Sequence, residues 1–384
     1  MLALASRGIL PHVADSAKRV GVQSVKGPNE SRIETLWGPW MWLMLAISSV
    51  AMVWPLWVSD LLPFQDLPQH LAAVRTIHSL DDPAWLLSKY HVVDLSRTQY
   101  LSWYLILDWM TTVMPLDVAC RVLLSLYVIS VPLSCYALLR ALHLDPTAAL
   151  LAAPLAFNTY LYMGFANYVS ALPIVLLALA LLVRSFGRWS LAEAFGLACL
   201  SVVLFYSHVQ ALLMYIGFAG LTLLLLAPSW RPRSWLRQMA HHVPTLGLLG
   251  LWMSRSRILA TGKAWAQGHG GRNTTEAKFH FEPVMDRFKA IPGQLIEAFP
   301  DDSDDHLLLV WVAALCLIAL LSVRGDLNDD APRQGAQPPR NFRAMLRERI
   351  GAVWLVAGFG VYLVSPLSYK WIWPISHRLI PLLA

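Results

Sequence analysis

The chain has 384 residues, of which 57% are hydrophobic and only 14% are charged, and its mean hydropathy is +0.50. Because a soluble globular domain carries about 25% charged residues, this composition excludes an ordinary soluble protein. It indicates a membrane protein that is embedded in the lipid bilayer. The net charge of +6 is not gathered into a long basic run, so we expect lysine and arginine to orient the chain in the membrane, and we expect no nucleic-acid partner.

Apolar stretches recur along most of the chain. A membrane-spanning helix needs about 20 mostly apolar residues. The clear candidates are 39–59, 117–139, 168–186, 191–207, 209–227, 306–323 and 349–366; the weaker ones are 146–163 and 239–256; and 371–384 resembles the start of another span. The sequence therefore predicts an all-α, polytopic transmembrane helix bundle with about 9 or 10 spans.

Arginine-rich short loops orient this bundle. The loops 140–146, 184–189 and 227–238 are basic, and we expect them on the cytoplasmic side together with the N-terminal tail. The segment 99–114 carries Asp108 in its middle, and a charge at the centre of a span costs about 2.5–3.5 kcal/mol on insertion scales. We therefore expect 99–114 to lie along the outer surface as a helix after the first span.

This assignment divides the chain into four parts. The expected parts are a cytoplasmic tail (1–38), a transmembrane core (39–256) with an external segment at 60–116, an external loop with an amphipathic helix (257–305), and C-terminal spans that we expect to be incomplete (306–384). We expect a multi-pass protein of the plasma (inner) membrane with a cytoplasmic N-terminus. The sequence is compatible both with 239–256 crossing the membrane and with its not crossing.

Asp66 and His70 are the first candidates for chemistry. Asp66 follows the first span and precedes Pro68, so it can serve as the N-cap of a helix that carries His70 four residues later. Equally, its carboxylate can act as a general base or as a ligand of Mg²⁺ or Mn²⁺, with His70 one helical turn away. The spacing is compatible with both interpretations, and they do not exclude each other.

Further polar residues fall on the expected outer face. The stretch "YMGFANY" combines Tyr162, Asn167 and Tyr168, and it forms either a tight turn with interfacial aromatic residues or a platform for a sugar or a polyprenyl chain. His208 lies at the turn between two spans, where it either caps the bundle or binds a phosphate oxygen. Lys370 and Arg378 flank the last apolar segment, and a charge within such sequence is either functional or extends to the interface.

The layout resembles that of the GT-C superfamily of polytopic glycosyltransferases over roughly 39–230. The matching residues are "FQDLPQH" (64–70), and "YLSWYLILDWMTTVMPLDVACRVL" (100–123) as the surface helix that leads into the second span. The resemblance implies a sugar donor linked to a lipid phosphate, a reaction outside the membrane, and an acidic residue of the first external loop as base or metal ligand, which is Asp66 here. Two features differ: Asp66 has no adjacent Glu, and the later spans stop at Ala384.

We therefore expect a membrane glycosyltransferase that moves a sugar from a polyprenyl-phosphate donor to an unidentified acceptor. Asp66 and His70 are the expected catalytic residues, with Asp66 also a candidate metal ligand. The expected substrate-binding residues are Tyr162, Asn167, Tyr168, His208, Lys370 and Arg378. The alternatives are non-enzymatic: a transporter or flippase, or a scaffold, for a lipid-linked precursor of the cell envelope.

Overall fold

The computed structural model describes residues 28–98, 100–186, 190–226, 236, 239–255, 279–295, 303–328, 349–369 and 374–384. The chain divides into two units, residues 1–46 and 47–384. In the first unit the described segment belongs to helix α2 (Pro28–Val58), which begins inside the segment that we expected to be a tail. All the other described elements belong to the second unit, which carries the candidate site.

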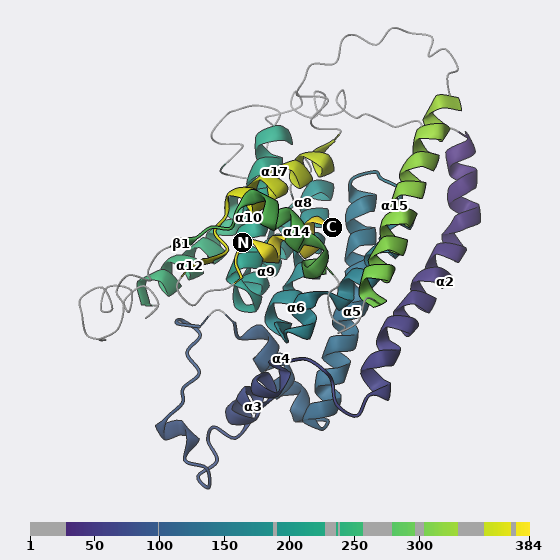
Figure 1. Cartoon of the computed structure of the whole chain (residues 1–384). Coiled ribbons are helices and arrows are strands. Elements are labelled where there is room, and N and C mark those ends of the chain that lie inside the picture. The colour runs from purple at the N-terminus through teal and green to yellow at the C-terminus, as the bar shows by residue number, and fades with distance from the viewer. Residues whose placement is uncertain are drawn as a thin grey trace, which may run out of the picture. The chain divides into compact units, whose positions relative to one another are not determined.

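The described part of the chain is mostly helical, as the sequence predicts (Figure 1). After α2 come α3 (Leu67–His78), η2 (Leu87–Lys89), α4 (Ser102–Thr111), α5 (Leu116–Ala141), η3 (Pro146–Ala152), η4 (Pro154–Phe157), α6 (Thr159–Tyr162), α7 (Ala166–Val169), α8 (Ala171–Ser185), α9 (Leu191–Ser207) and α10 (Val209–Leu226). The chain continues with η5 (Ala240–His242), α12 (Val243–Arg255), β1 (Phe279–His280), α14 (Val284–Leu295), α15 (Ser303–Asn328), α17 (Ile350–Val364), β2 (Ser368–Tyr369), η7 (His377–Leu379) and α18 (Ile380–Leu383). The two short strands pair antiparallel, with Phe279 opposite Tyr369.

Three helices in the described residues are long and apolar enough to cross a membrane: Pro39–Val58, Leu116–Ala141 and Ala166–Ser185. They coincide with three of the predicted spans. The shorter apolar helices Leu191–Ser207, Val209–Leu225 and Ile350–Val364 coincide with three more. The full polytopic bundle remains a prediction.

Two predicted spans take another form. Residues 146–163 form the 3₁₀ helices η3 and η4 and the one-turn helix α6 instead of a continuous α-helix. Pro154 lacks a backbone N–H and disfavours helical geometry in the residue before it, and the side chain of Asn158 accepts hydrogen bonds from the backbone N–H groups of Tyr160 and Leu161, which starts a new helix. In the last stretch, the described residues 374–384 likewise form only η7 and α18.

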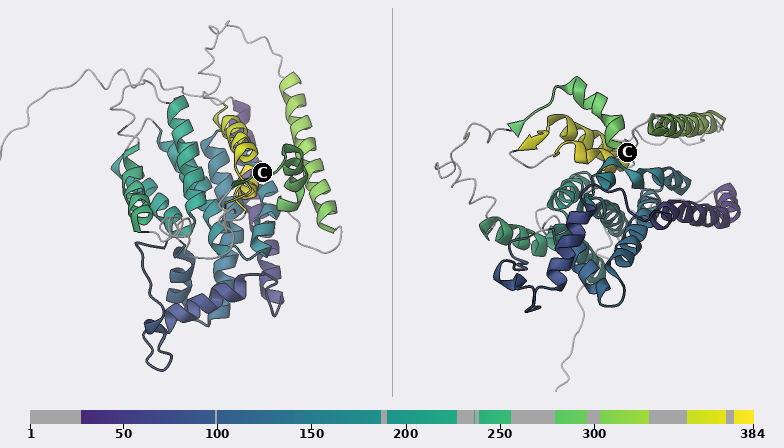
Figure 2. Two further views of the ribbon diagram at one scale, coloured as in Figure 1. Left: turned by 60° about the vertical axis from the view of Figure 1, so that its left-hand side comes forward. Right: turned by 60° about the horizontal axis from the view of Figure 1, so that its bottom comes forward.

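Helices α5, α8, α9 and α10 pack side by side, and α3 and α4 lie across one end of them (Figures 1 and 2). At this end α5, α8 and α10 begin and α9 ends. Ser102 of α4 hydrogen-bonds Ser207 of α9 between their hydroxyl oxygens at 2.8 Å, and the N–H of Leu101 donates to the carbonyl of Tyr206 at 2.8 Å. Helix α4 has 10 residues, about 15 Å at 1.5 Å per residue, which is too short for a span and agrees with the surface position predicted for 99–114.

The weaker crossing at 239–256 also reaches this end. Helix α12 finishes at Arg255, whose Nη1 donates to the hydroxyl of Ser96 at 3.2 Å in the segment before α4. The predicted amphipathic helix is α14. It buries Arg287 and Leu295 and leaves Met285 and Phe288 exposed, so its apolar residues divide between the core and the outside.

Candidate functional site

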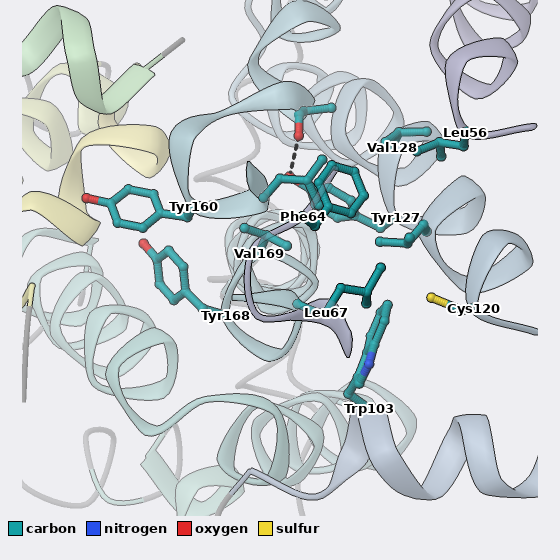
Figure 3. Close-up of a cluster of buried hydrophobic side chains, with 14 of the residues drawn as sticks. Leu56, Phe64, Leu67, Trp103, Cys120, Tyr127, Val128, Tyr160, Tyr168 and Val169 are labelled. Carbon is teal, nitrogen blue, oxygen red and sulfur yellow. Dashed lines mark hydrogen bonds between the residues drawn. The ribbon is translucent and has the colours of Figure 1, made fainter. Parts of the chain in front are cut away.

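Asp66 is held in place by the turn formed by residues 160–168. The N–H of Gln65 donates to the carbonyl of Tyr162 at 2.8 Å, and the N–H of Asp66 donates to the carbonyl of Met163 at 3.2 Å. On either side of this backbone pairing, Phe64 and Leu67 are buried in the hydrophobic core (Figure 3). Two backbone bonds and two apolar anchors therefore fix the loop that carries Asp66.

Gly164 makes this close approach feasible. Its φ of +82° lies in a region that favours glycine, and a Cβ atom at this position would lie 2.6 Å from the backbone N of Asp66 and 2.9 Å from that of Leu67. "YMGFANY" is thus a tight turn, as one of its two interpretations predicts. The turn also brings the chain against the Asp66 loop.

The carboxylate of Asp66 makes no hydrogen bond to any described residue. Asp66 occupies the N-cap position of α3, but its side chain forms no capping bond. The residue is half-buried. The position is that of a cap, while the carboxylate is free for another role.

His70 is linked to two other segments. Its Nδ1 lies 2.6 Å from the hydroxyl of Tyr104 on α4, and the backbone of Gly164 hydrogen-bonds the ring. Tyr104 in turn hydrogen-bonds the side chain of Asn167. Residues from α3, α4 and the 160–168 turn therefore form one hydrogen-bonded chain: Asn167, Tyr104, His70, Gly164.

Burial sets the protonation of this chain. Desolvation lowers the pKa of His70, and it outweighs the opposing effects of the nearby Asp66 charge and the Gly164 hydrogen bond. The pKa of Tyr104 is raised by burial, against a smaller lowering by the hydrogen bond from Asn167. At neutral pH both groups are therefore uncharged.

On the other side of the turn, Arg378 lies among aromatic rings. Its guanidinium carbon lies 4.7 Å from the ring centroid of Phe165 and 5.6 Å from that of Tyr168, within cation–π range. His208 stacks against Tyr100 at 4.8 Å between centroids and meets Tyr168 edge-on at 5.0 Å. We call Tyr100, Phe165, Tyr168, His208 and Arg378 the aromatic–arginine cluster.

A hydrogen bond fixes the tautomer of His208 in this cluster. Arg378 Nη1 lies 3.2 Å from His208 Nε2, and because a guanidinium has only donors, Nε2 accepts. The proton of the neutral ring is then on Nδ1. Burial, aided by the Arg378 charge, keeps the pKa of His208 well below its usual range, so the ring is neutral. The backbone carbonyl of Arg378 accepts from the hydroxyl of Tyr168, which fastens the C-terminal segment to the turn.

Some buried polar atoms in this region have no hydrogen-bond partner among the described residues, and two of them belong to the predicted site residues Asn167 and His208. They are Oδ1 of Asn167, in a side chain that is 7% exposed, and Nδ1 of His208, in a side chain that is 6% exposed. An unsatisfied buried polar atom costs about 1–3 kcal/mol and calls for an explanation. One is an acceptor and the other a donor, which together suit a ligand rich in hydroxyl and phosphate groups.

The predicted site residues thus converge at one end of the bundle, with exceptions. The 160–168 turn joins Asp66 and His70 on one side to His208 and Arg378 on the other, and no hydrogen bond links Asp66 directly to His208. Tyr162 packs its ring edge-on against Phe64, with 5.9 Å between the centroids. Lys370 lies outside the described residues.

Asp66 does not belong to a cluster of metal-ligating side chains in the described part of the chain. No group of three or more His, Cys, Asp or Glu side chains in the described part of the chain could hold a metal. Both ring nitrogens of His70 are already engaged, which leaves Asp66 as a single ligand. Farther along the chain, Asp304 is buried in the first turn of α15.

The sequence did not single out Tyr100, Tyr104 and Phe165, although all three contact the predicted residues. Tyr100 and Tyr104 are four residues apart in a segment read as a helix, a spacing that places two side chains on one face. This four-residue spacing of tyrosines could have identified the two residues as site candidates from the sequence. Phe165 stands within the quoted turn, but its contact with Arg378 depends on the tertiary structure.

Comparison with known proteins adds no assignment: no family model, no curated protein and no solved structure matches the chain.

Proposed function

We propose that this protein is a membrane glycosyltransferase that moves a sugar from a polyprenyl-phosphate donor to an acceptor hydroxyl at the outer face of the plasma membrane. One observation carries the proposal: a carboxylate without a hydrogen bond, at Asp66, and a cation enclosed by aromatic rings, at Arg378, are held on the two sides of a single turn. Transfer from a phosphate leaving group can use both charges, the carboxylate to take the acceptor's proton and the cation to stabilise the departing phosphate.

The reaction assigns one role to each side of the turn. The acceptor hydroxyl oxygen attacks the anomeric carbon of the sugar, and its proton passes to the carboxylate of Asp66. A new carbon–oxygen bond forms as the bond between the anomeric carbon and the phosphate oxygen breaks, and the electron pair leaves with the lipid phosphate. Asp66 later returns the proton to water. No external energy source is needed, because the donor is already activated.

The aromatic–arginine cluster suits the departing phosphate. The Arg378 guanidinium supplies positive charge in a partly desolvated setting, where electrostatic attraction is stronger than in water. The unpartnered Nδ1–H of His208 can donate to a phosphate oxygen. The ring of Tyr100, stacked on His208, adds apolar surface for the sugar or the first isoprene unit.

The acceptor side is built from the turn and α3. The unpartnered Oδ1 of Asn167 can accept a hydrogen bond from a sugar or acceptor hydroxyl. Tyr162 borders the Asp66 loop from the same turn, and Tyr168 holds the C-terminal segment beside it. His70 has both nitrogens engaged, so its role is to support the loop of Asp66 rather than to exchange a proton with substrate. The described residues contain no group of three or more metal-ligating side chains, and no step is assigned to a cation.

Transfer in proteoliposomes tests the proposal. Purified protein is reconstituted and supplied with a panel of polyprenyl-phosphate-linked radiolabelled hexoses and pentoses, together with a mixture of envelope glycan acceptors. We expect transfer by the wild type and at least a hundredfold loss in Asp66→Asn, a typical upper contribution of a general base being about 10⁴-fold.

Asp60→Asn is the matched control, because Asp60 is an exposed aspartate six residues earlier in the same segment. It should keep wild-type activity. Transfer that persists in Asp66→Asn removes Asp66 from the mechanism. Movement of the labelled donor across the bilayer without transfer refutes the enzyme and favours a transporter or flippase.

A further inference from the structure

The hydroxyl of Tyr104 lies between two groups of the candidate site that come from distant parts of the chain. It is 2.6 Å from Nδ1 of His70, and it also hydrogen-bonds the side chain of Asn167. Tyr104 stands on α4, between the Asp66 loop and the 160–168 turn, and its ring packs against His70 with 5.6 Å between the centroids.

We propose that Tyr104 is a positioning residue of the transfer reaction, whose hydroxyl orients the His70 ring and the Asn167 amide together. The inference rests on the proposed function and adds to it a residue that need not touch substrate. Its role is to determine which atom of Asn167 faces the acceptor.

The direction of each hydrogen bond follows from the donors available. Asn167 donates from its amide nitrogen to the phenol oxygen, since this bond stabilises the ionised form of Tyr104. The phenol proton is then free to donate to Nδ1 of the neutral His70. The remaining proton of the ring is on Nε2, which suits the carbonyl of Gly164 as acceptor. In this arrangement the phenol proton, the Nε2 proton of His70 and one amide proton of Asn167 each meet an acceptor.

The same arrangement explains the unpartnered atom of Asn167. An amide has a donor end and an acceptor end, and Tyr104 binds the donor end, so Oδ1 is left over and buried. If Tyr104 lost its hydroxyl, the amide could rotate by half a turn and exchange the two ends. The acceptor hydroxyl would then meet an N–H group instead of an oxygen. The His70 ring would also lose the bond that fixes its tautomer.

The titratable groups that face His70 are few. Asp66 comes from the start of the same helix, and Tyr104 comes from α4. The 160–168 turn contributes only neutral groups, the backbone of Gly164 and the amide of Asn167. A change at Tyr104 therefore reaches Asp66 through one neighbour, His70.

The experiment compares Tyr104→Phe with Tyr206→Phe in the proteoliposome assay. Tyr206 is a matched control at the same end of the bundle: it is also half-buried, and its hydroxyl donates to the carbonyl of Leu95, outside the site. We expect Tyr104→Phe to lower kcat by about 10- to 100-fold, the scale of a small misplacement of a reacting group, with KM changed by less than about threefold. Tyr206→Phe should retain both values.

A second measurement does not depend on activity. In ¹⁵N-histidine spectra of the purified protein, with His70→Gln to assign the signal, we expect the wild-type His70 to be neutral with its proton on Nε2. In Tyr104→Phe the two nitrogen signals should move toward a mixture of tautomers. Asn167→Asp, which cannot donate to Tyr104 and can take its proton instead, should give the same change.

The outcomes separate the two proposals. Wild-type protein that transfers no sugar refutes the proposed function, and the spectra alone then decide whether Tyr104 orients His70. An active wild type with Tyr104→Phe within twofold of its kcat refutes this inference and leaves the function standing. Unchanged His70 signals in Tyr104→Phe also refute it, whatever the activity.

Discussion

Gly164 lies directly against the backbone of Asp66, because a Cβ atom at position 164 would be 2.6 Å from Asp66 N and 3.0 Å from Asp66 Cα. The contact joins the loop after the first predicted span to a turn about a hundred residues later in the chain. It is the point at which the tertiary structure fixes the candidate base relative to the rest of the site.

Replacing Gly164 should therefore damage both the fold and the site. Gly164→Ala adds a Cβ at a positive φ and against backbone atoms that cannot move aside, so we expect a loss of about 1–3 kcal/mol in the free energy of unfolding and a fall in transfer of at least tenfold. Thermal unfolding in detergent and the transfer assay measure the two effects. Gly220→Ala is the control, since no atom lies within 4 Å of a Cβ there, and wild-type behaviour in Gly164→Ala would show that the contact is not tight.

The proposed outer position of the site can be tested by labelling single cysteines. In a variant without the four native cysteines, Ser88→Cys lies in the exposed segment between α3 and α4, and Leu144→Cys lies at the other end of α5 with its side chain 51% exposed. We expect a membrane-impermeant maleimide to label position 88 in intact cells and position 144 only after permeabilisation. The reverse pattern would place the candidate site in the cytosol and contradict the proposed reaction.

Arg378 should govern the affinity for the donor. Arg378→Gln removes the positive charge that lies over Phe165 and Tyr168, and we expect the KM for the polyprenyl-phosphate donor to rise about tenfold or more, which corresponds to about 1.4 kcal/mol. Donor titration at saturating acceptor measures it. Arg97→Gln removes an arginine whose side chain is 53% exposed, outside the cluster, and should leave KM unchanged. An equal effect in both variants would indicate general surface charge instead of a phosphate site.

Stability should fall at mildly acidic pH because of two histidines. Burial lowers the pKa values of His70 and His208 from the usual 6.5, so below about pH 6.5 the unfolded chain binds protons that the folded chain does not. Their contribution is complete above about pH 6.5 and is lost progressively as the pH falls toward the lowered folded values. We expect the melting temperature of the wild type to drop between about pH 7 and about pH 5. The double variant that carries both His70→Gln and His208→Gln should show a smaller drop.

His91→Gln is the control for this series, since His91 is exposed on the surface. It should follow the pH dependence of the wild type. A double variant with the full wild-type pH dependence would show that other groups are responsible.

Local sequence properties determined the helices of this protein. Apolar length alone located the helices at 39–58, 116–141 and 166–185, because burying a long uninterrupted apolar stretch requires that its backbone be hydrogen-bonded internally. The segment 146–163 is apolar but contains Pro154 and Asn158. The geometry of Pro154 and the cap formed by Asn158 divide it into short helices in place of the expected continuous one. The position of 99–114 followed from the side assigned to the basic loops and from Asp108, whose carboxylate pairs with His78 at 3.0 Å.

The sequence alone determined which polar residues lie near helix ends. Counting the predicted membrane crossings along the chain was enough to assign Asp66, Asn167 and His208 to the same end of the bundle. Only the tertiary structure decided how they are used. Whether Asp66 caps its helix, which hydroxyl holds His70, and which rings surround Arg378 all depend on contacts between segments far apart in the chain. Such contacts are set by the packing of helices against one another, and a sequence read one segment at a time does not contain them.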